Sequence, residues 1–432
     1  MNSAALSAEA SDLQNGVLGP LPSDWSTSTI AQTCEKPEYG YTESAQRANV
    51  GPKFIRITDI QDGGVNWATV PHCRCEESVI RRLGLRPGDL LIARIGGTTG
   101  KSFLVRDCPE AVFASYLIRL RATAIDPEFL YFFCQSDLYW RQVLASKGEK
   151  LKGGISGSTL GRIVLPLPGL PEQLAIASVL LKLQAAVKVQ DRIVATIKEL
   201  RAATMAKLFR EGLRGEPLKE TEIGEVPESW EVAQLGGLFD LQQGKALSQR
   251  AQRGVSPRPF LRTSNVFWGR VDLTTVDSMD FDAQEAQRLS LTPGDLLVCE
   301  GGEIGRTAMW TLPGTAFSFQ NHLHRLRSRS AEVFPEFFMY WMEVAFLQRR
   351  LYGGQGNRTT IPNLSASRLR GFSVPRPKRD EQLSIARVVS VIGDSLVSAE
   401  RKLDLLRSGF SAMLEGLLSG SLRLLASAAR QL

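Results

Sequence analysis

The chain has 432 residues and a net charge of +7 at pH 7, with 43% hydrophobic and 22% charged residues. This is the composition of an ordinary soluble protein with more than one core, and no run of about 18 apolar residues indicates a membrane-spanning helix. The first 20 residues contain no Lys or Arg and read as a flexible polar tail rather than a signal peptide. The mild basicity suits a partner that is a polyanion without requiring one.

The six cysteines have no framework spacing, which is typical of reduced thiols in a cytoplasmic protein. The one cluster that could ligate a metal is His72-Cys73-Arg74-Cys75. No second Cys or His pair completes a tetrahedral zinc site, so a loop with incidental thiols is the favoured interpretation. We therefore predict no metal and no other cofactor bound by this chain.

The chain contains one series of motifs twice, in the same order. A Pro-x-x-Trp motif occurs at 22–25 and 227–230, and GDLLIARIGGTTGKS at 88–102 recurs as GDLLVCEGGEIGRTA at 294–308. A Glu-Gln-x-x-Ile-Ala motif occurs at 172–177 and 381–386. The offset between copies stays between 205 (227 − 22) and 209 (381 − 172). This indicates a tandem duplication of one unit, and it predicts two look-alike domains.

The motif Gly100-Lys101-Ser102 resembles the end of a phosphate-binding loop, but the spacing to the preceding glycines is one residue short. The second copy has Gly305-Arg306-Thr307, which lacks the lysine such a loop needs. Both copies instead predict a strand that enters a tight glycine turn. A nucleotide-hydrolysing enzyme remains a rival hypothesis supported by this motif alone.

Each copy ends in a long segment almost free of Gly and Pro that predicts a helix of about 40 residues. In the second segment the apolar residues from Val389 to Leu417 alternate at spacings of three and four, which is the pattern of a coiled-coil seam. The first segment keeps this register from Leu180 to Leu208 with three polar interruptions, at Gln190, Arg201 and Thr204. Neither helix can bury its own stripe, so the expected partner of each is the other. The spacing fits a parallel or an antiparallel pair.

These features together resemble the specificity subunits of type I restriction-modification systems. The resemblance covers nearly the whole chain from Pro22 to Leu418 and includes the glycine-rich segments at 153–168 and 353–377. It implies a mixed α/β (α+β) fold in which two target recognition domains are separated by two long helices that form an antiparallel coiled coil. The expected boundaries are a flexible tail at 1–20, a first recognition domain at 21–168, a spacer helix at 169–212, a linker at 213–225, a second recognition domain at 226–377, a spacer helix at 378–418 and a C-terminal tail at 419–432.

The resemblance also implies that the chain is a non-catalytic DNA-binding subunit. Each domain would read one part of a split DNA target, and the helices would set the distance between the parts. Partner modification subunits, two in number, would hold S-adenosylmethionine and methylate adenine, and restriction subunits would use ATP and Mg²⁺. The segments 64–86 and 271–291 occupy equivalent places but are unrelated in sequence. We therefore predict an asymmetric, non-palindromic target.

Candidate DNA contacts are basic and amide residues near the glycine turns and in the glycine-bearing loops. Arg, Asn and Gln can read base edges in a bidentate manner, whereas Lys more often holds phosphate. The alternative for each residue is solvated surface or an internal ion pair, and the alternative for the whole chain is an interaction scaffold whose two domains bind protein. The candidates are Arg56, Arg94, Lys101, Lys147, Lys150, Lys152, Arg262, Arg306, Gln355, Asn357 and Arg358.

Overall fold

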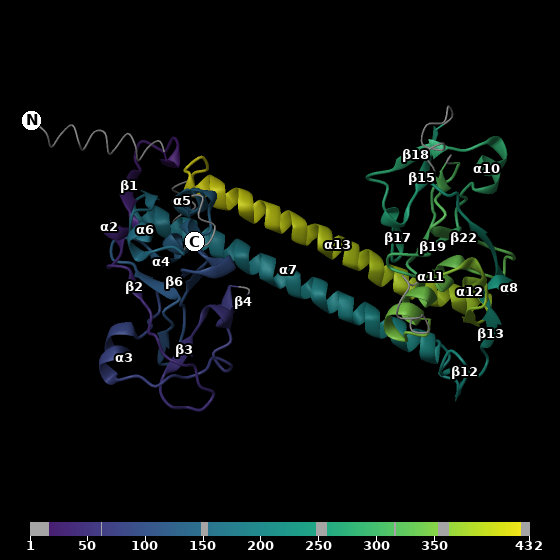
Figure 1. Ribbon diagram of the computed structural model, residues 1–432, viewed down its shortest axis with the longest axis horizontal. Coiled ribbons are helices and arrows are strands. Elements are labelled where there is room, and N and C mark those ends of the chain that lie inside the picture. The colour runs from purple at the N-terminus through teal and green to yellow at the C-terminus, as the bar shows by residue number, and fades with distance from the viewer. Residues whose placement is uncertain are drawn as a thin grey trace, which may run out of the picture. The chain divides into compact units, whose positions relative to one another are not determined.

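The computed structural model describes residues 17–61, 63–147, 154–247, 257–314, 317–352 and 363–424. The chain divides into two compact units, of which the second is Arg192–Arg401. The first unit combines Met1–Asp191 with Lys402–Leu432, so it is built from both ends of the sequence. Each unit contains one α+β domain and one half of each long helix (Figure 1).

The first domain is built on a four-stranded antiparallel sheet in which the strand order is β2-β9-β6-β7. Side chains alternate between the two faces of a strand, so Leu90 and Ile92 of β6 enter one core cluster while Leu91 and Ala93 enter another. The first cluster includes the aromatic residues of α4. The sheet strands are β2 (Glu38–Tyr39), β6 (Asp89–Ala93), β7 (Ser102–Leu104) and β9 (Leu117–Arg121).

Smaller elements complete the first domain around this sheet. The antiparallel pair β1 (Ser26–Thr29) and β10 (Val164–Leu167) brings the start and the end of the domain together. The remaining strands are the parallel pair β3 (Lys53–Ile55) and β8 (Ala111–Phe113) and the hairpin β4 (Ile60–Gln61) and β5 (Gly64–Val65). The helices are α2 (Ile30–Thr33), α3 (Glu77–Leu83), α4 (Pro127–Phe133), α5 (Asp137–Lys147) and α6 (Gly157–Gly161).

The second domain repeats this plan. Its four-stranded antiparallel sheet has the order β14-β22-β19-β20, formed by β14 (Phe239–Gln243), β22 (Leu323–Ser328), β19 (Leu296–Cys299) and β20 (Thr307–Met309). The other strands are β11 (Leu218–Lys219), β12 (Val226–Pro227), β13 (Glu231–Gln234), β15 (Pro257–Leu261), β16 (Val266–Phe267), β17 (Arg270–Val271), β18 (Asp277–Asp280), β21 (Ser318–Phe319) and β23 (Ser373–Arg376). The helices are α8 (Leu235–Leu238), α10 (Ala283–Arg288), α11 (Pro335–Glu343) and α12 (Ala366–Arg370), and a π-helical turn at Val344–Gln348 continues α11.

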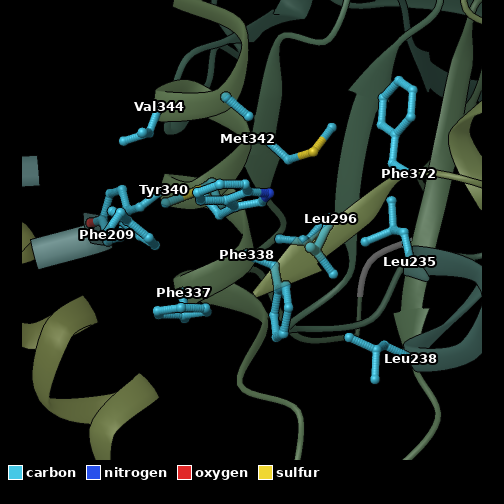
Figure 2. Packing of buried hydrophobic residues seen from close by; sticks show 14 of the residues in the cluster. Phe209, Leu235, Leu238, Leu296, Phe337, Phe338, Tyr340, Met342, Val344 and Phe372 are labelled. Carbon is cyan, nitrogen blue, oxygen red and sulfur yellow. The ribbon is translucent and has the colours of Figure 1, made fainter. Parts of the chain in front are cut away.

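Aromatic residues join each domain to its long helix. In the second unit Phe209 of the long helix α7 (Leu170–Glu211) lies 5.0 Å from the Phe337 ring of α11, measured between ring centroids. Figure 2 shows Phe209 beside Tyr340, with Phe337, Phe338 and Leu296 in the same core. In the first unit, Phe129, Phe132 and Phe133 of α4 are fully buried, so this aromatic stripe belongs to the core. Burial of such rings is the main stabilising contribution at both junctions.

The second long helix, α13 (Arg379–Leu418), is antiparallel to α7 within each unit. In the first unit the start of α7 (Ile176 and Leu180) shares a core with the end of α13 (Leu414 and Leu417). In the second unit the end of α7 packs with the start of α13, where Ile385 and Val389 are buried. The predicted antiparallel coiled coil is confirmed, and the teal and yellow helices of Figure 1 show it directly.

The predicted seam is the buried side of both helices. Ala399 and Leu403 are 8% and 6% exposed, whereas the neighbouring Val397 and Leu405 are 44% and 74% exposed. Of the polar interruptions in α7, Arg201 forms a bidentate pair with Glu343 of α11, in which Nη2 donates to Oε2 at 2.8 Å. The hydrogen bonds to Glu343 raise the pKa of Arg201. A charged residue therefore fits this seam position because α11 supplies its partner.

Both long helices are apolar enough, by length and composition alone, to cross a membrane, with a mean hydropathy of 1.2 in the most apolar stretch of each. Part of this apolar character lies in the seam that the two helices share, and the rest is exposed on the outer faces. Charged residues such as Lys198 and Glu400 form an ion pair at 2.8 Å between the two helices. The packing of the two helices against each other thus accounts for part of their apolar character.

Two local predictions were wrong. The sequences FIRITDI at 54–60 and FLRTSNV at 260–266 each predict a single strand, but each strand ends early and a 3-10 turn follows, at Ile57–Asp59 and Thr263–Asn265. The cause is a side chain three residues on, because Asp59 Oδ2 and Asn265 Oδ1 accept the backbone N–H of Arg56 and Arg262 at 2.9 Å. The amphipathic segment 127–147 predicts a single helix, but the structure has two helices there, α4 and α5, separated at 134–136.

A buried glutamine attaches each domain to its long helix. Gln173 accepts a hydrogen bond from Asp126 N and donates one to Pro168 O, both at 2.8 Å. Gln382 makes the same two bonds, accepting from Phe334 N and donating to Pro377 O, again at 2.8 Å. These contacts explain why the Glu-Gln-x-x-Ile-Ala motif occurs in both copies, and they give its glutamine a structural role.

Candidate nucleic-acid interface

The glycine turns that follow β6 and β19 are alike, although the second is one residue shorter. Gly100 and Gly305 have φ angles of 95° and 82°, a region that favours glycine. Their backbone N–H groups donate to Ala93 O and Cys299 O at 2.8 and 2.9 Å. A Cβ on Gly100 would lie 3.0 Å from the Trp140 ring, so the turn is also tightly packed. The prediction of a strand entering a glycine turn is confirmed.

The turn is followed by a strand, not a helix. Ser102 begins β7 and Thr307 begins β20, and each strand pairs back onto the strand before the turn. A phosphate-binding loop delivers its backbone N–H groups at the start of a helix, which these turns lack. The geometry therefore gives no support to nucleotide hydrolysis.

Arg94 and Glu300 occupy equivalent positions where the central strand of each sheet ends. Arg94 N donates to Tyr116 O at 3.0 Å, and Glu300 N donates to His322 O at 2.9 Å. The carbonyl groups are equivalent as well, since Ile155 N donates to Arg94 O and Leu364 N to Glu300 O at 2.8 and 2.9 Å. The backbone is thus the same in both domains while the side chains differ in charge.

In the first domain this strand end carries a basic and aromatic surface. The Arg94 guanidinium lies 4.7 Å from the centre of the Tyr39 ring, and Tyr39 and Tyr116 are 40% and 57% exposed. Arg56 and Tyr116 line a pocket of about 390 Å³, although Arg56 is also held by Asp59, to which its Nη2 donates at 2.8 Å. Lys101 is exposed. Exposed aromatic rings and cations can stack on bases and neutralise phosphates.

In the second domain the predicted cations are more engaged with the protein. The Arg306 side chain is 13% exposed, and its Nη2 donates to Thr263 O at 2.7 Å. Arg262 is 46% exposed and pairs with Asp277 at 2.6 Å. The side chains around Glu300 are Gln243 and His322, neither of which was predicted as a site residue. An alignment of the two copies, which pairs Gln243 with Tyr39 and His322 with Tyr116, could have identified them.

The remaining candidates lie in or beside the glycine-bearing loops. Lys147 is the last residue of α5. Lys150, Lys152, Gln355, Asn357 and Arg358 lie outside the described residues, so their role stays a prediction.

Other arginines that look like DNA contacts are internal. Arg121 of β9 forms a bidentate ion pair with Asp89 at 2.7 and 2.8 Å, and Arg327 of β22 forms the same pair with Asp295. Both aspartates are 1% exposed, and the Asp89 bonds raise the pKa of Arg121. The aspartate of the repeated Gly-Asp-Leu-Leu motif therefore has a structural role, as one member of an internal ion pair.

The cysteines are free, and burial raises the pKa of Cys73 to about 12, so this thiol is poorly suited to become a thiolate ligand. Among the described residues no group of three or more His, Cys, Asp or Glu side chains could hold a metal ion.

Comparisons with known proteins agree with this geometry. The type I restriction modification DNA specificity domain matches residues 227–405. The MjaVIII specificity subunit of Methanocaldococcus jannaschii is 25% identical over 82% of this chain and 79% of its own length. The StySPI specificity subunit of Salmonella potsdam is 24% identical over 86% of this chain and 82% of its own length.

A solved S subunit from M. genitalium has the same fold, with a TM-score of 0.57 at 15% identity over 93% of this chain and 97% of its own. A chain from another solved type I restriction-modification system gives a TM-score of 0.54 at 17% identity over 93% of this chain and all of its own. The repeated domains, the helix pair and the sequence relatives agree. Residues 227–405 match the type I restriction modification DNA specificity domain, and over more than 80% of its length the chain is similar to type I restriction enzyme specificity subunits.

Proposed function

We propose that this chain recognises a bipartite, asymmetric DNA sequence on behalf of modification and restriction subunits. The domain at 21–168 reads one half-site and the domain at 226–377 reads the other. The observation that carries the proposal is a single backbone scaffold, the strand and glycine turn, that occurs twice with different side chains at its end. Two domains that share a backbone arrangement but carry different side chains are suited to recognise two different half-sites.

The asymmetry extends to the segments between the shared motifs. The first domain places α3 in the segment 64–86, whereas the second places β18 and α10 in the segment 271–291. Loops and inserted elements on a fixed scaffold are where binding specificity resides. A non-palindromic target follows from this difference.

The long helices supply the spacing between half-sites in this proposal. A helix of 42 residues such as α7 spans about 63 Å at a rise of about 1.5 Å per residue. The seam buries one side of each helix and thereby stiffens the pair. Insertion or deletion of residues in both helices should therefore change the number of base pairs between half-sites.

Apolar side chains on the outer faces of the helices support docking of partners. Exposed apolar residues away from the seam mark surfaces that bind other proteins. We infer two modification subunits that bring S-adenosylmethionine and flip the target adenine into their own pockets, and restriction subunits that bring ATP and Mg²⁺, all in the cytoplasm. The exposed residues are Leu174, Val189, Ile193, Leu200, Val391, Val397 and Leu405.

The decisive experiment maps methylated adenines in host DNA, by single-molecule sequencing, in cells with and without this gene. The expected result is one split motif with two different halves and a fixed spacer, present only when the gene is present. A motif that is a perfect palindrome, or no gene-dependent methylation in the presence of the partner subunits, would contradict the proposal.

Phosphate and base contacts can be separated by the salt dependence of binding. Lys101→Ala should weaken binding uniformly and reduce the slope of affinity against salt, as expected for a phosphate contact. Arg358→Ala should relax selectivity in the second half-site if that residue reads a base. An effect of Lys101→Ala on ATP hydrolysis by the isolated chain would instead support the nucleotide-hydrolase hypothesis.

A further inference from the structure

The strand end of the second domain carries a carboxylate where the first domain carries a guanidinium. Glu300 is 6% exposed, although a carboxylate is rarely buried unless a cation or a set of hydrogen-bond donors compensates it. In the described part of the chain the only ion-pairing partner within 4.0 Å is His322, whose Nδ1 lies 4.0 Å from Oε2 and which carries a charge only when it is protonated. No Lys or Arg among the described residues pairs with it. This arrangement is unexpected for a purely structural acid, such as Asp295, which has a bidentate arginine.

The neighbours of Glu300 hold the carboxylate in one orientation. The Gln243 side-chain amide donates to Glu300 Oε2 at 3.1 Å and to Asn321 O at 3.0 Å, so this amide bridges β14 and the turn before β22. The other oxygen, Oε1, accepts no hydrogen bond from the described residues and is not among the fully buried atoms that lack a partner. One carboxylate oxygen is therefore fixed, and the other accepts no hydrogen bond from the described residues, which leaves it as the candidate acceptor for a base-edge donor.

The chemistry of Oε1 restricts what it can recognise on DNA. A carboxylate repels phosphate, so it does not add affinity along the backbone. Its complement on a duplex is a base-edge donor, and the exocyclic amino group of cytosine is the donor that Glu and Asp accept from in the major groove. Arg94 at the equivalent position is suited to the opposite pattern, the two acceptors of guanine. The same backbone position thus presents an acceptor in one domain and donors in the other.

We propose that Glu300 is a specificity-determining residue that accepts a hydrogen bond from the N4 amino group of a cytosine in the second half-site, with Gln243 positioning it. This inference rests on the proposed function, because it assumes that the strand end faces DNA. It assigns to the second domain a base preference that the first domain, with Arg94, does not share.

The test is selection of DNA targets from a randomised library by the complete complex with modification subunits, read out as methylation. Glu300→Gln keeps the shape of the side chain but adds a donor, so it no longer excludes bases that present an acceptor. We expect discrimination at one base pair of the second half-site to fall roughly ten- to hundred-fold. Selectivity in the first half-site should stay unchanged, which shows that the variant complex is folded and active.

Glu303→Gln is the matched control. Glu303 is in the same turn and carries the same charge, but its side chain is 69% exposed and pairs with Arg306 at 3.4 Å. We expect this variant to select the wild-type target with unchanged discrimination. If both variants relax the same base pair, the effect is one of charge near the DNA and the assignment of Glu300 as a reader is wrong.

The outcomes separate this inference from the proposed function. A wild-type complex without sequence-selective methylation would remove the proposed function and this inference with it. A selective wild-type complex whose Glu300→Gln variant selects the same second half-site with the same discrimination would overturn the inference alone, as would a position that prefers adenine in the wild type. If Glu300→Gln fails to assemble, Glu300→Asp decides, because withdrawing the acceptor by one methylene should weaken the same preference, and an unchanged preference would overturn the inference.

Discussion

The junction between each domain and its helix has changed little between the two copies, whereas the strand ends have changed completely. Gln173 and Gln382 make the same pair of hydrogen bonds at the same 2.8 Å distances. Arg94 and Glu300, on identical backbone, have opposite charge. The difference reflects what each side chain is bonded to. A residue whose side chain pairs with buried backbone cannot change without leaving a donor or acceptor unpaired. At the strand ends the shared bonds are made by the backbone of Arg94 and Glu300, so the side chain can change.

The largest expected effect on stability comes from removing the internal ion pair of each sheet. Asp89→Ala leaves Arg121, whose side chain is 20% exposed, without its partner, and Asp295→Ala does the same to Arg327, which is 37% exposed. Removing one member of a buried pair costs about 3 kcal/mol. We expect a loss of that size in the first domain and a somewhat smaller loss in the second, because Arg327 is better solvated. Denaturant unfolding followed domain by domain through hydrogen exchange measures both.

The control for this pair is Glu77→Ala, since Glu77 is 78% exposed in its contact with Arg81. It should change stability by less than about 0.5 kcal/mol. Equal losses for Asp89→Ala and Glu77→Ala would show that the internal pair is not structural.

The second-largest loss of stability is expected when the glutamine that attaches each domain to its long helix is removed. Gln173→Ala and Gln382→Ala each strip partners from a buried N–H and a buried C=O, which costs about 1–3 kcal/mol. The two variants should lose similar amounts because the bonds are the same, measured as the free energy of unfolding of the affected domain. A large loss in one domain with none in the other would break the equivalence of the two junctions.

A pH-dependent effect should distinguish the second domain from the first. His324 is fully buried, its Nδ1 has no hydrogen-bond partner among the described residues, and burial lowers its pKa below the usual value of 6.5. The unfolded chain therefore binds a proton more readily than the folded one, so stability falls as pH drops from about 6.5 toward the lower folded pKa. The first domain has Ile118 at this place in the sheet. His324→Ile should remove this acid-dependent loss.

The measurement is the unfolding midpoint of the second domain between pH 7 and pH 5, with the first domain of the same chain as internal reference. The midpoint of the variant should depend on pH less than that of the wild type. An unchanged pH dependence would mean that other groups titrate there.

The smallest effect should come from the exposed ion pairs of the helices. Arg407 pairs with Asp191 at 2.7 Å, with side chains 56% and 43% exposed. Such pairs contribute less than about 1 kcal/mol. Arg407→Ala should shift the thermal midpoint of the first unit only slightly, and calorimetry at two salt concentrations would detect any larger, salt-sensitive contribution.

The duplication made most of the fold predictable, because an interpretation of one motif could be compared with its second copy. The seam from Val389 to Leu417, the glycine turns and the aromatic core were all readable from spacing. The strand predictions were wrong where a single side chain redirects the backbone, as Asp59 and Asn265 do. The arginines were hardest to assign, because Arg121 and Arg56 look alike in sequence and only burial separates an internal ion pair from a surface contact. Glu300 was missed because an acidic residue is not an expected DNA contact.

The contribution of residues 402–432 to the first unit determines when that unit can fold. Leu414, Leu417 and Leu418 complete a core whose other members, such as Phe129 and Ile176, leave the ribosome more than two hundred residues earlier. The nascent first domain must therefore wait, with an apolar surface uncovered, until residues 414–418 have been synthesised. A chain shortened at its C-terminus would lose more than a tail, since the damage would fall on the domain at the opposite end of the sequence.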